Sequence, residues 1–322
     1  MHNMQTISFS FHEVAPYINW LYFFHAWGFP ARLGSIAKVH GCDACRMNWL
    51  QAFSPDEQPK AREAMKLFDD AQRLIATLDS RYQCHARVAI LPAYSENDDI
   101  VVLMEEETEK KKESFWSKEN VIRIPLLRQQ SPNEHGNCLC LSDFIKPFPQ
   151  FTDEIDAADF SSAYSKVGIF ACSVDHEMEE QYAEDEYLHL LHQTLADRLA
   201  EATAERMHEM VRKTIWGYAP NEHLTLDQLF SEEYQGKRPA VGYPSLPDQS
   251  LNFVLDKIID FRTIGISLTE NGAMRPHAST SGLMLAHPAT CHFNIGTIAD
   301  DQIEEYAKRR GMTVDAIRKF LR

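Results

Sequence analysis

The sequence lacks the segments that several large classes of protein require. Its 13 glycines contain no pair two residues apart, so GxGxG-type nucleotide loops are absent, and the P-loop, GxSxG and HExxH segments are absent as well. No basic-then-apolar signal region opens the chain. The apolar run Ile18–Phe24 is far shorter than the roughly 20 residues that span a bilayer. We therefore expect a soluble, cytoplasmic protein that does not contact membranes.

Positive charge is also scarce. The 32 lysines and arginines face 47 aspartates and glutamates, a formal net charge of −15, and such a field repels nucleic acid and anionic lipid. We expect no nucleic-acid partner. The seven cysteines are an odd number in a chain too long to need disulfides, which favours reduced, mostly buried thiols. Cys42-Asp-Ala-Cys45 is a single CxxC without a second pair at zinc-ribbon spacing, so it is weak evidence for a metal.

Hydrophobic spacing, with 44% apolar residues to fill a core, indicates the main elements. Helices are predicted over 59–78, 183–218, 300–310 and 314–321, with Thr313 as an N-cap and Gly311 as a helix stop. Strands are predicted over 87–92, 99–104 and 166–174, the first two forming a hairpin. Residues 105–113 form a solvated charge run, and 131–136 a loop. We expect one domain over 1–322, with a two-lobed form left open.

Three segments carry candidate chemistry. Arg238–Pro244 combines two prolines, a glycine and one guanidinium suited to a planar carboxylate, or it is a plain surface loop. The segment Leu268–Gly282, rich in hydroxyls and glycine, indicates only a packed loop. The third is an acidic column of four carboxylates spaced by four on the long helix, either a solvated face or a surface for a cationic partner. The column consists of Asp197, Glu201, Glu205 and Glu209.

These segments resemble, in order and spacing, the activation module of cobalamin-dependent methionine synthase over nearly the whole chain. The residues that carry the resemblance are Tyr17–Trp27, Ala196–Glu201, Trp216–Glu222, Tyr234–Pro244, Leu268–Glu270 with Ala273-Met274, Ala278–Gly282, and Asp301-Gln302 with Tyr306-Ala307.

The resemblance implies an α+β fold, C-shaped or helmet-like, around a twisted antiparallel sheet, which binds S-adenosylmethionine in a shallow groove without a Rossmann fold. In this family the module docks over a cobalamin domain whose cofactor has oxidised to cob(II)alamin. An electron from flavodoxin or an equivalent reductant, and a methyl group from S-adenosylmethionine, then restore methylcobalamin. Because the chain has no Asp-x-His-x-x-Gly segment to ligate cobalt, the cobalamin is expected on a partner.

Site residues follow from the resemblance by position. Arg238 matches the arginine that holds the methionine carboxylate, and Tyr243 matches a tyrosine next to the corrin face. Asp197 and Glu201 match an acidic pair thought to meet the cobalt-ligating histidine of the cobalamin domain. The remaining ligand-binding positions are Asn19, Glu232, Pro239, Ala240, Gly242, His292 and Phe293.

The sequence departs from the family at two of these places. Asn19 replaces an aspartate, which removes the counter-charge for a ligand ammonium but keeps a hydrogen-bonding group. His292-Phe293 replace a pair of tyrosines, although Phe293 can still offer its ring to a sulfonium. The leading hypothesis is therefore a separate activation subunit for methionine synthase or another corrinoid methyltransferase. The alternatives are a non-catalytic S-adenosylmethionine sensor or corrinoid-protein chaperone, and a zinc protein that uses Cys42 and Cys45.

Overall fold

A computed structural model of the chain describes residues 3–104, 121–134, 136–148, 164–180, 182 and 184–321. The predicted charge run at 105–113 lies outside these ranges. Within them, no helix combines the length and the apolar character that crossing a membrane requires.

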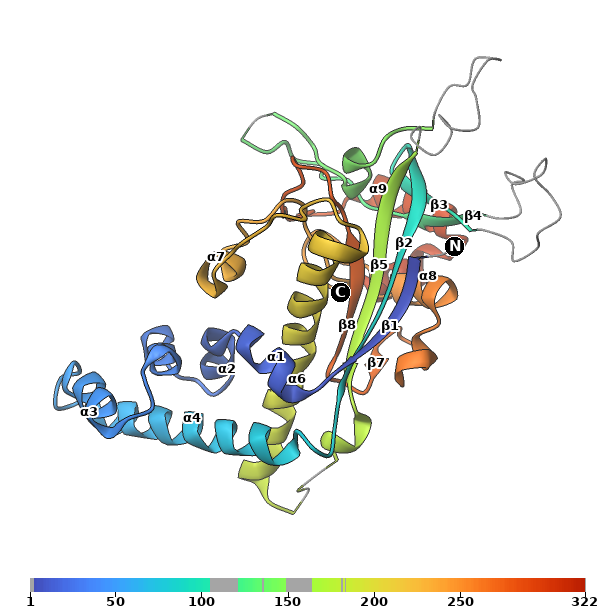
Figure 1. Ribbon diagram of the computed structural model, residues 1–322. Helices are drawn as coiled ribbons and strands as arrows, with labels where there is room; N and C mark the ends of the chain where they lie inside the picture. The colour runs from blue at the N-terminus through green and yellow to red at the C-terminus, as the bar shows by residue number, and fades with distance from the viewer. Residues whose placement is uncertain are drawn as a thin grey trace.

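The centre of the fold is an open six-stranded sheet whose ladders are all antiparallel over the described residues (Figure 1). Its strand order is β4-β3-β2-β5-β8, and β1 pairs with the first half of β2 on the edge that β3 takes over further along. The strands are β1 (Asn3–Phe9), β2 (Cys84–Glu96), β3 (Asp99–Leu103), β4 (Val121–Pro125), β5 (Ser165–Val174) and β8 (Ser279–Met284). The predicted hairpin is confirmed, with Glu96 opposite Asp99 and Asn97 at a φ of 54° in the turn.

Both faces of this sheet are buried, because side chains alternate between two apolar cores. In β5, Phe170 and Cys172 join the core beneath the long helix, whereas Ile169 and Ala171 join the core on the opposite face. Strands buried on both faces have few polar positions, and that is why β2 and β5 could be recognised as apolar runs.

One face of the sheet carries the N-terminal helices and the long helix (Figure 1). The long helix α6 begins with Asp185 as its N-cap and continues into one π-helical turn, so the predicted helix is confirmed with slightly shorter bounds. These elements are α1 (Phe11–Val14), α2 (Trp20–Ala26), α3 (Asp43–Gln51), α4 (Gln58–Leu78), α6 (Glu186–Met210) and the π turn η6 (Val211–Ile215). In Figure 1 the helical arm of α2 to α4 and the segment around α7 (Leu226–Phe230) extend from the same side of α6, which gives a C-shaped outline.

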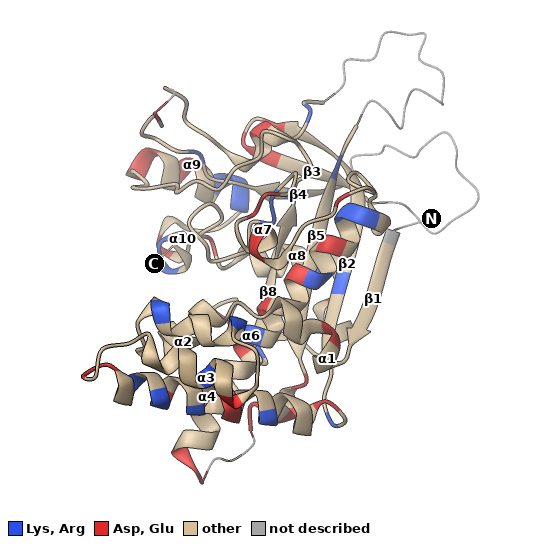
Figure 2. Ribbon diagram, turned by 60° about the vertical axis from the view of Figure 1, so that its left-hand side comes forward, with Lys and Arg blue, Asp and Glu red and all other residues tan. Residues whose placement is uncertain are grey.

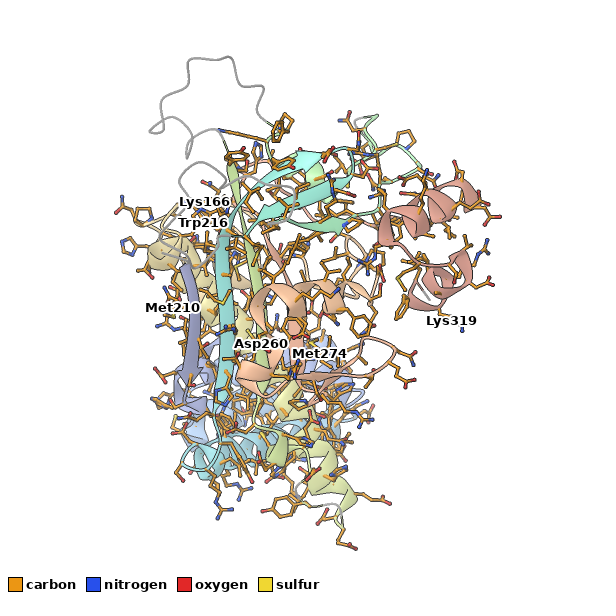
Figure 3. The ribbon with its side chains drawn as sticks, turned by 90° about the vertical axis from the view of Figure 1, so that its right-hand side faces the viewer. Lys166, Met210, Trp216, Asp260, Met274 and Lys319 are labelled. Carbon is orange, nitrogen blue, oxygen red and sulfur yellow. The ribbon has the colours of Figure 1, made fainter. Side chains whose placement is uncertain are left out.

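The opposite face is covered by α8 (Leu251–Ile259), and a C-terminal pair of helices packs near β4 (Figure 3, where Asp260 marks the end of α8 and Lys319 lies in α10). The pair is α9 (Asp300–Arg310) and α10 (Val314–Phe320), and both predicted helices are confirmed, with Gly311 as C-cap and Thr313 as N-cap. The predicted helix at 59–78 is likewise confirmed as α4.

Two expectations were wrong. The segment 268–282 is not only a packed loop, because it contains a short hairpin, β6 (Ser267–Leu268) with β7 (Met274–Arg275), and the first residues of β8. The cysteines are all free, but only Cys84, Cys140 and Cys172 are buried, so most of the seven thiols are not.

Candidate functional site

The segment that begins with Arg238 lies along β8 and is therefore held by the sheet. Val241 donates its N–H to the Ser281 carbonyl at 2.9 Å, and Leu283 donates to the Pro239 carbonyl at 3.0 Å. Gly282 permits this approach, because a Cβ there would lie 2.2 Å from the Pro239 carbonyl oxygen. The first half of the segment is therefore not a plain surface loop, whereas Gly242, Tyr243 and Pro244 form an exposed turn.

This segment forms one wall of a cleft of about 780 Å³. Nine of the predicted residues line it: Asn19, Glu201, Glu232, Arg238, Pro239, Ala240, Tyr243, His292 and Phe293. Asp197 lines a smaller adjoining cavity of about 300 Å³, together with Glu201 and Tyr243. Gly242 is not among the lining residues of either cavity, and its φ of 90° and its hydrogen bond to the Leu246 carbonyl, 2.9 Å, place it in a turn.

A charged pair in the wall of the cleft joins Arg238 to Glu205 of α6, and their side chains are 14% and 21% exposed. The guanidinium also lies over the Phe170 ring, 5.4 Å from its centroid. Burial alone would lower the pKa of Arg238, but Glu205 raises it above its ordinary value, so the arginine stays charged. Arg238 Nε and Glu205 Oε2 are buried and have no hydrogen-bond partner among the described residues.

The four carboxylates of the acidic column are half-buried and each has a partner, so the column is more than a solvated face. Glu201 accepts from Arg198 at 2.8 Å and from the Tyr243 hydroxyl at 3.3 Å. Burial raises the pKa of Asp197, and His277, 3.4 Å away, partly opposes this rise. Burial, and then Glu201, raise the pKa of Tyr243, which nevertheless exposes 53% of its surface.

Two arginines of α6 offset the repulsion within the column. Arg198 pairs with Glu201, and Arg206 pairs with Glu209 at 3.2 Å, so that acidic and basic residues lie close together along α6 (Figure 2). Arg212 instead forms a buried pair with Glu222, 2.7 Å away.

The two places of departure from the family both lie at the cleft. Asn19 is the N-cap of α2, and its side-chain oxygen accepts the Leu21 N–H at 3.1 Å. That oxygen is consequently engaged in holding the helix. His292 Nε2 lies 3.2 Å from Glu232 Oε2, and this contact lowers the pKa of Glu232. Lys237 lies 3.4 Å from the same carboxylate.

Other lining residues were not predicted as site residues. Tyr17 and Tyr22 belong to the segment Tyr17–Trp27, which carried part of the resemblance without either tyrosine being singled out. Tyr234 lies against the buried Arg212 guanidinium, 4.1 Å from ring centroid to Cζ, and no local pattern reveals this contact. The full set is Tyr17, Tyr22, Arg198, Glu205, Leu229, Phe230, Tyr234, Pro244, Ser245, Thr280 and Asn294.

Comparison with known proteins concerns the whole chain and its fold. The family model described as "Vitamin B12 dependent methionine synthase, activation domain" matches residues 10–311. A solved structure, the MetH reactivation domain bound to AdoHcy, is similar over 99% of this chain and 89% of its own, with 30% identity and a TM-score of 0.78. The α+β fold with an open antiparallel sheet is that of the solved relative. The chain belongs to the family of vitamin B12-dependent methionine synthase activation domains.

Proposed function

We propose that this protein binds S-adenosylmethionine in the 780 Å³ cleft and supports the reductive reactivation of cobalamin carried by a partner. The partner is a cobalamin-binding methionine synthase chain or a related corrinoid methyltransferase, and a flavodoxin-like reductant supplies the electron. Residues 1–322 act in this role as one activation domain. The activity is thus that of a methionine synthase component in methionine biosynthesis.

The observation that carries the proposal is a pair of unpaired buried atoms on two residues that line the cleft. Arg238 Nε lacks an acceptor and Glu205 Oε2 lacks a donor among the described residues. Buried polar atoms in native proteins nearly always have a partner, from the protein, from water or from a ligand. A zwitterionic amino-acid group supplies both needs, because its carboxylate accepts from the arginine and its ammonium donates to the glutamate. The AdoHcy bound by the solved relative carries such a group.

The neighbouring residues suit the rest of the ligand. Pro239 and Val241 form their backbone hydrogen bonds with β8, so the Ala240 N–H points away from that strand, as alternation along an extended segment requires. Phe293 also lines the cleft, and an aromatic ring whose face meets a sulfonium attracts it by roughly 0.5–2 kcal/mol. Glu232 adds a second carboxylate whose lowered pKa keeps it ionised at neutral pH.

The residues proposed to meet the partner lie beside the cleft. Asp197 and Glu201 line the smaller cavity, and Tyr243, at the boundary of both cavities, is largely exposed. Two carboxylates here would accept hydrogen bonds from an imidazole presented by the cobalamin-binding chain. S-adenosylmethionine, when bound, supplies an electrophilic methyl group, and the partner's cobalt supplies the nucleophile. This chain's own contribution is to bind S-adenosylmethionine, to orient its methyl group toward the partner's cobalt and to provide charged side chains around both.

The test mixes this protein with the cobalamin-binding methionine synthase chain of the same organism in its cob(II)alamin form, S-adenosylmethionine and reduced flavodoxin. Absorbance should change toward methylcobalamin, and a mixture without S-adenosylmethionine should not change. A spectrum that stays that of cob(II)alamin in the complete mixture would refute the proposal.

A second function, a non-catalytic S-adenosylmethionine sensor or corrinoid-protein chaperone, is favoured by one observation. The Asn19 oxygen is engaged in capping α2, so this position offers no carboxylate to a ligand ammonium. Calorimetric binding of S-adenosylmethionine without any change in the partner's spectrum would support this second function.

A further inference from the structure

A second group of reactive side chains lies at the start of α3. His40, Cys42 and Cys45 each place one ligand atom within 4.8 Å of those of the other two. Cys42 and His40 are exposed and Cys45 is half-buried, so solvent reaches the group directly. In Figure 1, α3 lies at the outer end of the helical arm, on the far side from the sheet, and none of the three residues lines the cleft described above.

Local structure holds the three side chains together. Cys42 is the N-cap of α3, with extended dihedral angles of −76° and 150°, and Cys45 is the third helical residue. Positions three apart on a helix are neighbours, so the two sulfurs fall on one side of the first turn. His40 is joined to this turn by the Cys42 N–H, which lies 3.4 Å from the imidazole Nδ1.

Contacts elsewhere on α3 fix the helix without using these ligands. Arg46 forms two hydrogen bonds, 2.8 and 2.6 Å long, with Asp69 of α4. Trp49 donates to the Ser35 hydroxyl at 2.9 Å. Arg46, the basic residue next to Cys45 in the sequence, is thus bound to α4. The helix that carries the two cysteines is held by two contacts outside the cluster.

The ligand set indicates which ion would bind. Thiolate sulfurs and an imidazole nitrogen are typical of zinc, whereas calcium and magnesium prefer oxygen. Structural zinc sites use four protein ligands, and sites with three leave a position for water or another molecule. No fourth histidine, cysteine, aspartate or glutamate of the described residues belongs to this group.

We propose that His40, Cys42 and Cys45 form a mononuclear zinc site whose fourth coordination position is open to water or to a side chain of a bound protein. Binding displaces the thiol protons of Cys42 and Cys45, and the imidazole binds through a neutral ring nitrogen. The site is separate from the S-adenosylmethionine cleft, so it is independent of the function proposed above.

The test measures zinc binding by the full chain, kept reduced and stripped of metal with a chelator. Competition with a chromophoric chelator should give one zinc per chain, and cobalt(II) should give thiolate-to-cobalt charge-transfer absorption. Cys42→Ser, Cys45→Ser and His40→Gln should each weaken zinc binding roughly 100-fold or more. Substitution of a residue that only hydrogen-bonds to a metal ligand already lowers metal affinity about 10- to 100-fold, and these variants remove a ligand itself. Cys291→Ser, which removes another exposed cysteine, is the matched control and should bind as the wild type does.

Several results would overturn the site. One is the absence of stoichiometric zinc binding, and another is equal zinc affinity in the wild type and the Cys45→Ser variant. A third is loss of zinc affinity in both cysteine variants but not in His40→Gln, which would show that the two thiols bind zinc without the histidine. Circular dichroism of each variant verifies folding. S-adenosylmethionine affinity, expected to be unchanged in all of them, separates failure of this site from failure of the cleft.

Discussion

The sharpest test of the cleft is removal of the Arg238 guanidinium. Among the described residues this side chain makes one ion pair, to Glu205, and its Nε has no hydrogen-bond partner. Arg238→Ala removes the guanidinium donors and leaves Glu205 without its partner. Arg238→Lys keeps the charge but not the planar fork that can hold both oxygens of a carboxylate.

The expected loss of affinity follows from the kind of bond. A hydrogen bond to a charged group contributes about 1.5–3 kcal/mol, which corresponds to roughly 10- to 150-fold in affinity. Arg238→Ala should lose about this much affinity for S-adenosylmethionine, and Arg238→Lys should lie between the alanine variant and the wild type. Glu205→Gln should lose less than Arg238→Ala, because glutamine keeps an acceptor for the ammonium but not the charge.

A second ligand separates direct contact from damage to the fold. 5′-Methylthioadenosine lacks both the carboxylate and the ammonium, so its affinity should change by less than about 3-fold in all three variants if the lost bonds are those to the amino-acid group. Isothermal titration with both ligands gives the comparison, and thermal unfolding reports the stability of each variant. Equal losses for the two ligands would mean that Arg238 only holds the wall of the cleft, and no loss for either would remove it from the site.

Three other perturbations have expected outcomes. Asp197→Asn with Glu201→Gln should leave S-adenosylmethionine affinity unchanged but slow reactivation of the partner's cobalamin, and a wild-type rate would remove the pair from the docking surface. Arg212→Met leaves the buried Glu222 carboxylate without its ion-pair partner, since the Arg212 side chain is 0% exposed. The free energy of unfolding measured with urea should therefore fall by about 3–5 kcal/mol, and adding Glu222→Gln should recover most of this loss. Burial holds the pKa of His208 well below its ordinary value, so below pH about 6.5 the unfolded chain binds a proton that the folded chain does not. The free energy of unfolding should therefore fall as the pH is lowered from 7 to 5, by up to about 1.4 kcal/mol per pH unit, and His208→Leu should flatten this dependence.

The elements that could be predicted from the sequence are those whose signal is local. The helix α4 and the hairpin of β2 and β3 depend on side-chain periodicity and on a turn at Asn97, all contained within short windows. The strand β8 was missed because Ser279–Gly282 has no apolar alternation, and its conformation depends on pairing with β5 on one edge and with the Arg238 segment on the other. Such pairing joins residues far apart in the chain, and no local pattern reports it.

The same division applies to the sites. The resemblance placed nine residues at the cleft, but it could not show that Asn19 caps a helix or that Glu205 holds Arg238. For the proposed zinc site, the sequence showed the CxxC segment but gave no signal for His40, two residues before Cys42. A histidine at that spacing gains meaning only when the backbone brings its ring to the first turn of α3, which the sequence alone does not specify.

The acidic column also explains how the cleft is assembled. Like charges spaced by four residues lower the stability of a helix by roughly 0.2–0.5 kcal/mol per neighbouring pair. A neutral residue in place of one carboxylate would reduce this cost. Here three of its carboxylates bind different parts of the chain: Tyr17 near the N-terminus reaches Glu209, Arg238 reaches Glu205, and Tyr243 reaches Glu201. Hydrogen bonds to charged groups contribute about 1.5–3 kcal/mol each, so the contacts of Glu205 and Glu209, which are 21% and 19% exposed, outweigh the repulsion. The column is thus the common anchor that brings the N-terminal segment and the Arg238 segment to the same cleft.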